Sequence, residues 1–320
     1  MTPTLRQLEY VVALADSGHF SEAARACAVS QPALSKQIRE VEELLGVALF
    51  ERVRPRALVT PAGEEVVARA RRLLADAREL ADAARAFAGA PQGTIRLGVI
   101  PTIAPYGLPG LLARLRDLLP GVAFAIRELQ THMLVEQLRA GTVDLGLLAQ
   151  PFEAHGLTGP DLVVEPFVLI APAGHPLAVP GPVSPAEIVG ASLILMEDGH
   201  CLRDQALDVC AVAGRPPPTS VTAASVTTLV RMVESGLGAT LLPASALQPE
   251  VRAGQGLVVR SFAAPQPGRT LTLQWRATSP HAPWFLRIGE ALRAHYLSLN
   301  AGLPPVAGPV PALRAVEPAA

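Results

Sequence analysis

The chain has 320 residues, a formal net charge of −1 and a hydrophobic fraction of 50%. This length predicts two domains, and the nearly balanced charge gives no global signal for a nucleic-acid partner. Because no apolar stretch reaches membrane-spanning length and the N-terminus lacks a signal-peptide pattern, we expect a cytoplasmic protein with no membrane partner. The three cysteines then fall in a reducing compartment, where a disulfide is more often a sensor than a structural bond.

The first sixty residues have the pattern of a helix-turn-helix. Apolar residues at helical spacing predict a first helix over residues 5–15, and Ser21 is expected to cap a short second helix that ends at Ala28. Ser30 is the expected N-cap of a third helix, with Pro32 in its first turn. The N-terminal part of such a third helix is the part that meets base edges in the DNA major groove.

Residues 49–61 follow as a predicted hairpin, or wing, around an Arg-Pro-Arg turn. Residues 25–39 and 52–56 hold no acidic residue and three basic residues each, namely Arg25, Lys36 and Arg39, then Arg52, Arg54 and Arg56. Charge gathered in this way is the expected footprint of a phosphate-binding surface. A solvated basic face is a reasonable alternative for the wing alone, but a weaker one for the wing and the helix-turn-helix together.

A long helix is predicted from Pro61 to about Ala88, followed by a hinge that ends near residue 92. Its apolar residues repeat at alternating spacings of four and three, a heptad seam that calls for a partner helix; they are Val66, Ala70, Leu73, Ala77, Leu80, Ala84 and Phe87. A single helix packed on its own domain is the alternative, but the regular spacing favours dimerisation.

From residue 93 to about residue 300, apolar strands alternate with helical patterns. This alternation predicts an α/β domain with a largely parallel sheet, in two subdomains. Ligands of such sheets bind beyond the carboxyl ends of the strands, so we expect Pro101-Thr102, Gln130-Thr131 and Gly199-His200-Cys201 around one crevice. Residues 301–320, rich in Pro, Ala and Val, are expected to be a disordered tail.

Cys201 and Cys210 stand on one predicted helix that begins just after Asp198-Gly199-His200. The positive end of the helix dipole and the neighbouring imidazole both favour a reactive thiolate at Cys201. Nine residues of helix separate the two residues by roughly 13 Å, whereas a disulfide requires Cα atoms within about 7 Å. The two thiols could therefore join only if the helix came undone. Cys27, in an alanine-rich helix, is expected to be a packing residue.

The DNA-binding pattern resembles that of the LysR-type transcriptional regulators. The resemblance rests on the segments Phe20-Ser-Glu-Ala-Ala, Val29-Ser-Gln-Pro-Ala-Leu-Ser-Lys-Gln-Ile-Arg, Glu42-Glu-Leu-Leu-Gly, Leu49-Phe-Glu-Arg and Thr60-Pro-Ala-Gly63. It implies a winged helix-turn-helix over residues 1–60, a dimerising linker helix with its hinge over 61–92, and an effector domain over 93–300 that is similar to periplasmic binding proteins. It also implies that DNA contacts come from Ser30, Gln31, Pro32, Ser35, Lys36 and Arg39, with Arg52, Arg54 and Arg56 on the backbone or minor groove.

The effector domain resembles the hydrogen-peroxide-sensing branch of this family. The most specific segment is Gly199-His-Cys-Leu-Arg-Asp-Gln205 with a second cysteine nine residues after the first. By this resemblance Cys201 reacts with peroxide and Cys210 resolves it to a disulfide, while Thr102, Thr131, His200, Gln205 and Arg269 surround the peroxide. The resemblance further implies double-stranded operator DNA, RNA polymerase, a dimer or tetramer of the chain itself, and glutaredoxin or thioredoxin as reductant. We expect no cofactor.

Two other functions and a metal site are alternatives on the sequence. A LysR-type regulator could bind a small carboxylate or aromatic effector in the same crevice, with both thiols inert. A thiol peroxidase is a second alternative, but it would give the helix-turn-helix and the heptad linker no purpose, so we expect no enzyme. A zinc site of His200, Cys201 and Cys210 is disfavoured, because the adjacent His and Cys point in different directions and a fourth ligand is lacking; we expect no metal.

Overall fold

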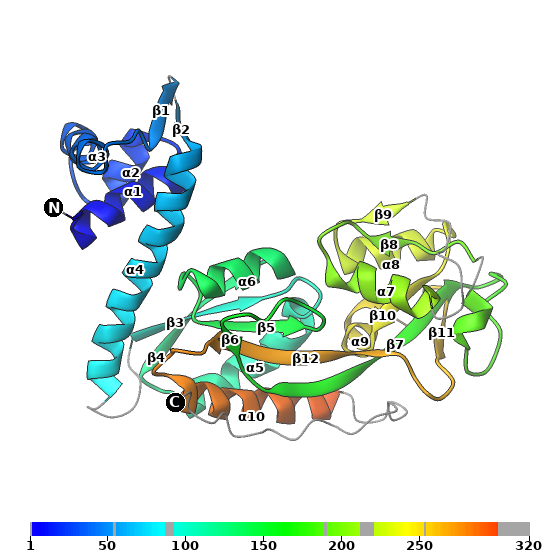
Figure 1. Ribbon diagram of the computed structural model, residues 1–320. Helices are drawn as coiled ribbons and strands as arrows, with labels where there is room; N and C mark the ends of the chain where they lie inside the picture. The colour runs from blue at the N-terminus through cyan, green and yellow to red at the C-terminus, as the bar shows by residue number, and fades with distance from the viewer. Residues whose placement is uncertain are drawn as a thin grey trace. The chain divides into compact units, whose positions relative to one another are not determined.

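The structure is a computed structural model that describes residues 2–53, 56–86, 93–188, 191–211, 221–252 and 254–299. The chain separates into an N-terminal unit that ends with α4 and a C-terminal unit that begins with β3 (Figure 1). The expected hinge up to residue 92, the seam residue Phe87 and the expected tail over residues 301–320 lie outside the described residues.

The N-terminal unit is a winged helix-turn-helix followed by a long helix. Its elements are α1 (Leu5–Ser17), α2 (Phe20–Ala26), α3 (Gln31–Leu45), β1 (Phe50–Val53), β2 (Arg56–Val59) and α4 (Pro61–Ala86). The three helices share one apolar core, which includes Val11, Leu14, Leu34 and Ile38, all fully buried. The predicted wing is confirmed, since β1 and β2 pair antiparallel.

The predicted start of α3 is confirmed, and the predicted start of α2 is wrong. The Ser30 hydroxyl accepts the Ala33 N–H at 3.4 Å, and Pro32 lies in the first turn of α3. In α2, the N-cap position belongs to His19, which makes no side-chain capping bond, so Ser21 lies inside the helix. The Ser17 hydroxyl instead accepts the His19 N–H at 3.3 Å, which fixes the turn before α2.

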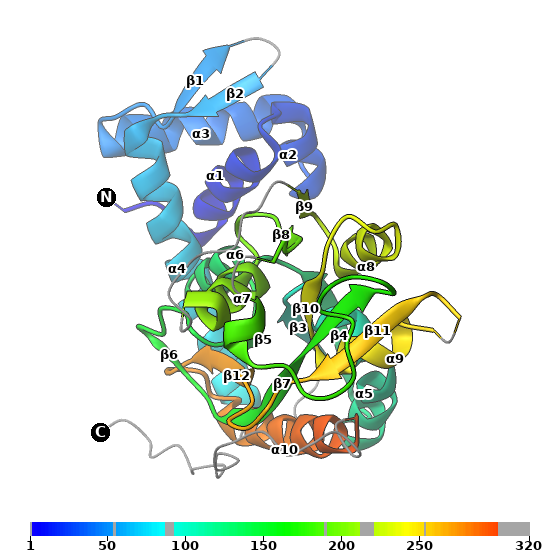
Figure 2. The ribbon, with the colours of Figure 1, turned by 90° about the vertical axis from the view of Figure 1, so that its right-hand side faces the viewer.

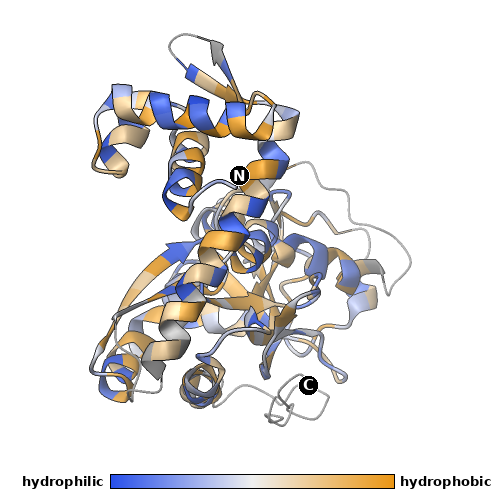
Figure 3. Ribbon diagram, turned by 60° about the vertical axis from the view of Figure 1, so that its left-hand side comes forward, coloured by the Kyte–Doolittle hydropathy of each residue, from blue (hydrophilic) through white to orange (hydrophobic). Residues whose placement is uncertain are grey.

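The apolar residues of α4 divide between two faces. Val67 joins the core of the unit, and Ala70 and Leu74 pack against Leu8 of α1. Leu73 and Leu80 are 52% and 75% exposed, and Figure 3 shows hydrophobic and hydrophilic residues interspersed along the helix. Part of the predicted seam therefore packs inside the unit, while two large members remain open to solvent.

The C-terminal unit has two lobes, each with its own apolar core. The first lobe is built from β3 (Gly93–Val99), α5 (Ala104–Leu118), β4 (Val122–Glu128), α6 (Thr131–Arg139), β5 (Leu145–Ala149), β6 (Leu157–Thr158) and α10 (Ala282–Leu299). The second is built from η1 (Pro185–Ile188), β8 (Leu195–Met196), α7 (Cys201–Ala211), β9 (Thr222–Ala223), α8 (Val226–Glu234), β10 (Thr240–Pro243), η2 (Ala244–Ala246), α9 (Leu247–Glu250) and β11 (Leu257–Ser261).

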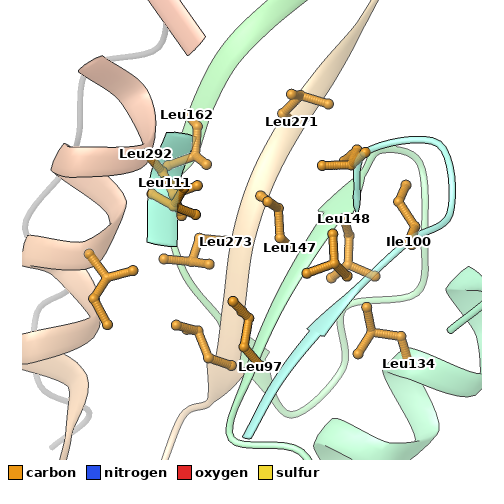
Figure 4. Close-up of a cluster of buried hydrophobic side chains, with 14 of the residues drawn as sticks. Leu97, Ile100, Leu111, Leu134, Leu147, Leu148, Leu162, Leu271, Leu273 and Leu292 are labelled. Atoms are coloured by element: carbon orange, nitrogen blue, oxygen red, sulfur yellow. The ribbon is translucent and has the colours of Figure 1, made fainter. Parts of the chain in front are cut away.

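Two long strands join the lobes, β7 (Asp161–Pro172) and β12 (Gly268–Arg276). Leu162 and Val163 of β7 lie in the first core, whereas residues 167–171 of the same strand lie in the second. Helices α6 and α10 cover opposite sides of the sheet (Figures 1 and 2). The first core therefore packs on both sides of the sheet, with Leu134 of α6 on one side and Leu292 of α10 on the other (Figure 4).

The expected largely parallel sheet is wrong in one respect. The pairs β3–β4, β3–β5 and β8–β9 are parallel, as the alternation of strands and helices predicts. Strand β12, however, runs antiparallel to β5 and β7, and β7 runs antiparallel to β10 and β11. The reason is that β7 and β12 carry the chain in opposite directions between the lobes. Among the described residues, no helix is long and apolar enough to span a membrane.

Candidate functional site

Helix α7 begins at Cys201, as the sequence predicts. The preceding turn contains Gly199 in the left-handed region, with a φ of 89°. A Cβ at this position would stand 2.8 Å from the Oε1 atom of Gln130, so the turn requires glycine and lies against the end of β4. Arg203 fastens the turn from within the helix, because it pairs with Asp198 at 2.8 Å and donates to the Met196 carbonyl at 3.2 Å.

Arg269 joins the two crossing strands to the first lobe at this site. Its Nε donates to Oε2 of Glu165 at 2.8 Å, its Nη1 to the Thr102 hydroxyl at 2.8 Å, and its Nη2 to the Thr102 carbonyl at 3.0 Å. Both side chains of the ion pair are fully buried, and Arg269 lies within electrostatic reach of Cys201. The other Glu165 oxygen accepts the Ser245 N–H at 3.0 Å, which adds the second lobe to the network.

Three polar atoms of the residues predicted to surround the peroxide are closed from solvent and have no hydrogen-bond partner among the described residues. They are the Thr131 Oγ1, the His200 Nδ1 and the Gln205 Oε1. The Nε2 of Gln205 donates to the Gln150 carbonyl at 2.7 Å, which fixes the orientation of the amide and leaves its oxygen as the unused acceptor. A buried polar atom without a partner is costly, so each of these three atoms would gain from a hydrogen-bonding partner.

The two thiols of α7 belong to different cores. Cys201 is 9% exposed and lies in the core of the first lobe, whereas Cys210 is 1% exposed and lies in the core of the second. Both are free. Burial raises the pKa of the Cys210 thiol to about 11. A bond between them requires one thiol to leave its own core.

The expectation that the imidazole of His200 activates Cys201 is not supported. His200 is 7% exposed, and burial lowers its pKa, so the ring is neutral at pH 7 and offers no positive charge. The positive charge near Cys201 comes instead from Arg269, together with the amino-terminal end of α7.

Glu165 is the functional residue that the sequence reasoning missed. It is the single charged residue within the apolar segment Val163–Ile170, in the middle of a strand. A carboxylate in a strand buried on both faces requires a charged partner, and that signal was available in the sequence. The partner itself was not, because Arg269 lies 104 residues further along the chain.

The candidate DNA-binding residues of α3 lie on the face opposite its buried side chains. Gln31, Pro32, Lys36 and Arg39 are exposed, while Leu34, Ile38 and Val41 are buried. Ser30 is exposed and caps the helix, and Ser35 is half-buried with its hydroxyl accepting from Arg39 at 3.2 Å. Lys36 is paired with Glu40 at 3.6 Å.

The wing carries Arg52 on β1 and Arg56 on β2, opposite Ala57 and Val53 respectively. Arg56 is exposed. Arg54, expected at the tip, lies outside the described residues.

Cys27 packs in the core of the N-terminal unit, as predicted, and burial raises the pKa of its thiol. Within the described ranges, no group of three or more His, Cys, Asp and Glu side chains is arranged to hold a metal ion.

Comparison with known proteins gives one consistent family. Residues 5–64 match the bacterial regulatory helix-turn-helix protein, LysR family, and residues 88–296 match the LysR substrate binding domain. The chain is 41% identical over 292 residues to a probable hydrogen peroxide-inducible genes activator of Streptomyces viridosporus, which covers 91% of this chain and 94% of the relative. It is also 41% identical over 290 residues to the DNA-binding transcriptional dual regulator OxyR of Escherichia coli (strain K12), covering 91% and 95%.

A solved structure agrees with these relatives. A full-length OxyR variant from Pseudomonas aeruginosa superposes with a TM-score of 0.77 at 36% identity, over 91% of this chain and 94% of that one. The likeness therefore extends across both units.

Proposed function

Because the chain belongs to the LysR family of bacterial transcriptional regulators, and within it to the OxyR group, we propose that it senses hydrogen peroxide through Cys201. In the proposed cycle the Cys201 thiolate attacks one peroxide oxygen, the O–O bond breaks, and the leaving hydroxide takes a proton to form water. The Cys210 thiol then attacks the sulfenic sulfur, a second water leaves, and the Cys201–Cys210 disulfide forms. A dithiol reductant such as glutaredoxin or thioredoxin returns both thiols by exchange.

The observation that carries this proposal is that three of the residues predicted to surround the peroxide have buried polar atoms without partners among the described residues. Hydrogen peroxide offers no apolar surface, so selective binding needs donors and acceptors that are already in place. Thr131, His200 and Gln205 supply three such atoms, and Arg269 holds Thr102 at the end of β3. Arg269 also supplies the positive charge that stabilises the thiolate and the developing negative charge on the leaving oxygen.

The placement of the two thiols supports a conformational signal. Cys201 and Cys210 lie roughly 13 Å apart along α7 and in separate cores. Disulfide formation would therefore unwind residues 201–210 and withdraw one thiol from its core. The changed surface of the second lobe would alter how copies of the chain pack, which would pass the redox state to the DNA-binding units.

The N-terminal unit supports operator binding by a dimer. The exposed face of α3 presents Gln31, Lys36 and Arg39, and Leu73 and Leu80 of α4 are free to pair with a second copy. Two such units would read two half-sites on double-stranded DNA. We infer that pairs of dimers form a tetramer that recruits RNA polymerase at oxidative-stress genes.

The decisive experiment maps disulfides after one equivalent of hydrogen peroxide is added to the reduced full chain. Free thiols are alkylated, and peptides are identified by mass spectrometry. We expect a Cys201–Cys210 link with Cys27 still alkylated, the same link in Cys27→Ser, and none in Cys201→Ser. If both thiols of α7 stay free in the wild-type chain, the redox mechanism is wrong, and a regulator with a small-molecule effector is the better description. Sustained turnover of peroxide with a reductant, at a rate independent of DNA, would point instead to a thiol peroxidase.

The division of labour between the units gives a prediction at Arg39. Arg39→Ala should weaken operator binding by about 1–3 kcal/mol, with no change in the rate of Cys201 oxidation. Arg252→Ala, at an exposed arginine of the C-terminal unit, is the matched control and should leave both properties unchanged. Equal damage to DNA binding and to peroxide reactivity by Arg39→Ala would contradict the separate roles of the two units.

A further inference from the structure

A cavity of about 760 Å³ borders α7 on a wall that includes neither thiol. Its lining comes from the end of β5, from β7, from η1, from α7 and from the segment that joins β11 to β12. A hollow of this size is in the range that holds small organic ligands. Much of the wall is apolar, and it includes Pro151, Phe167, Pro185, Val209 and Pro265.

The side-chain nitrogens of Gln205, Gln266 and Arg269 in this wall already donate hydrogen bonds within the chain. The Gln205 Nε2 donates to the Gln150 carbonyl at 2.7 Å, and the Gln266 Nε2 donates to the Phe262 carbonyl at 3.1 Å. Each of the three nitrogens of Arg269 donates to Glu165 or Thr102, and the side chain is fully buried. Because the Arg269 nitrogens are engaged with Glu165 and Thr102, the formal charge of this wall that lacks an ion-pair partner among the described residues is that of Asp208.

Two acceptor groups of the wall have no partner among the described residues. Gln266 is 7% exposed, and its Oε1 has no hydrogen-bond partner among the described residues. Asp208 is exposed on α7 and forms no ion pair with any residue that the structure describes. A carboxylate ligand would meet Asp208 with like charge, whereas an ammonium group would find both an anion and a free carbonyl oxygen.

We propose that this cavity binds a small organic cation, with an apolar body against the prolines and Phe167 and an ammonium group at Asp208 and Gln266. Three residues of its wall, Gln205, Asp208 and Val209, lie in the segment between the two cysteines. If that segment unwinds on oxidation, which rests on the proposed function, the cavity exists in the reduced chain alone. Occupancy would then stabilise the reduced state by mass action and slow disulfide formation.

The site is tested on the reduced full-length chain with three naphthalene probes of one shape and different charge. Isothermal titration should show one-to-one binding of 1-naphthylmethylammonium, with 1-naphthoate at least tenfold weaker and 1-naphthylmethanol between them. Absence of binding by the ammonium probe, or equal binding by the carboxylate, would overturn the proposed site.

Matched variants locate the probe. Asp208→Asn should weaken binding of the ammonium probe roughly two- to fivefold, as expected for a solvent-exposed ion pair. Asp204→Asn removes an equally exposed carboxylate one turn earlier on α7, outside the wall, and should have no effect. Ala263→Trp, which enlarges an exposed wall residue, should abolish binding. Equal losses in the two asparagine variants would show general attraction to an acidic helix and would overturn the site.

The link to redox state has its own readout. After oxidation and removal of peroxide, the chain that carries the Cys201–Cys210 disulfide should bind the ammonium probe at least tenfold more weakly. Unchanged affinity would contradict the coupling. If peroxide forms no disulfide while the reduced chain binds the probe, the proposed function fails and the cation site stands; if the disulfide forms but the reduced chain binds no probe, the reverse holds.

Discussion

The two ends of α7 carry the same side chain in opposite surroundings. At its start, Cys201 lies within electrostatic reach of Arg269 and directly follows His200, whose Nδ1 has no hydrogen-bond partner among the described residues. At its end, Cys210 lies in an apolar core, where burial raises the pKa of its thiol to about 11. Because the thiolate is the nucleophile, the difference supports our proposal that Cys201 reacts first and Cys210 second.

The two ends of α7 are also held in place by different kinds of interaction. Near the Cys201 end lies a buried polar network. In it, Arg269 donates to Thr102 and to Glu165, and Glu165 accepts the Ser245 N–H. The Cys210 end depends on packing with apolar neighbours. A buried polar network favours one geometry, because breaking it leaves polar groups without partners at a high cost in free energy. A side chain held only by apolar contacts can leave them and return without leaving a polar group unpaired. In the proposed cycle, α7 would therefore stay fixed at its Cys201 end and be released at its Cys210 end.

Removal of one partner from the polar network should give the largest effect. Glu165→Gln leaves Arg269 charged and unpaired in a fully buried position, so the free energy of unfolding should fall by about 3–5 kcal/mol. Urea denaturation of the reduced chain measures this. Glu187→Gln, at an exposed residue paired with Arg260 at 3.2 Å, is the matched control and should cost far less. Equal losses would show that burial of the Arg269–Glu165 pair is not what holds the Cys201 end.

The burial of the Cys210 thiol should make the free energy of unfolding fall at alkaline pH. A thiol in the unfolded chain has a pKa of about 8.5, and the folded value for Cys210 is raised to about 11. The stability that this shift contributes is complete below the unfolded pKa and is lost as the pH rises toward the folded value. Between pH 7.5 and pH 10, the wild-type chain should therefore lose about 1–2 kcal/mol more than Cys210→Ala.

The check is denaturation of both chains at both pH values. The pH 7.5 pair gives the cost of the smaller side chain alone, because the thiol is protonated there in both states. Parallel losses in the two chains would mean that Cys210 is hydrated in the folded protein, and the contrast between the two ends would disappear.

The local features of the molecule were predictable from sequence, and its long-range pairing was not. The start of α3 followed from Ser30 and Pro32, and the start of α7 followed from the glycine turn before Cys201, because caps and turns depend on a few adjacent residues. Ser21 failed as a cap because His19 and Ser17 form the turn before α2.

The residues of the candidate site come from the sequence, whereas their connections come from the structure. Thr102, Thr131, His200, Gln205 and Arg269 follow from the family resemblance. Their arrangement depends on β7 and β12, which run antiparallel between the lobes and bring Glu165 beside Arg269. The cavity beside α7 could not be predicted from the sequence either, because its wall combines segments from five parts of the chain.

The smallest expected effect tests the unpartnered atoms themselves. Thr131→Val removes a buried hydroxyl that makes no hydrogen bond, so stability should hold while the rate of Cys201 oxidation falls roughly three- to tenfold, the worth of one hydrogen bond. Rapid-quench alkylation measures that rate. Thr240→Val is the matched control: its hydroxyl donates to the Ile194 carbonyl at 2.7 Å, so this variant should lose stability and keep its rate. If Thr131→Val instead loses stability at an unchanged rate, the hydroxyl serves the fold, and the polar end of α7 is not organised around a ligand.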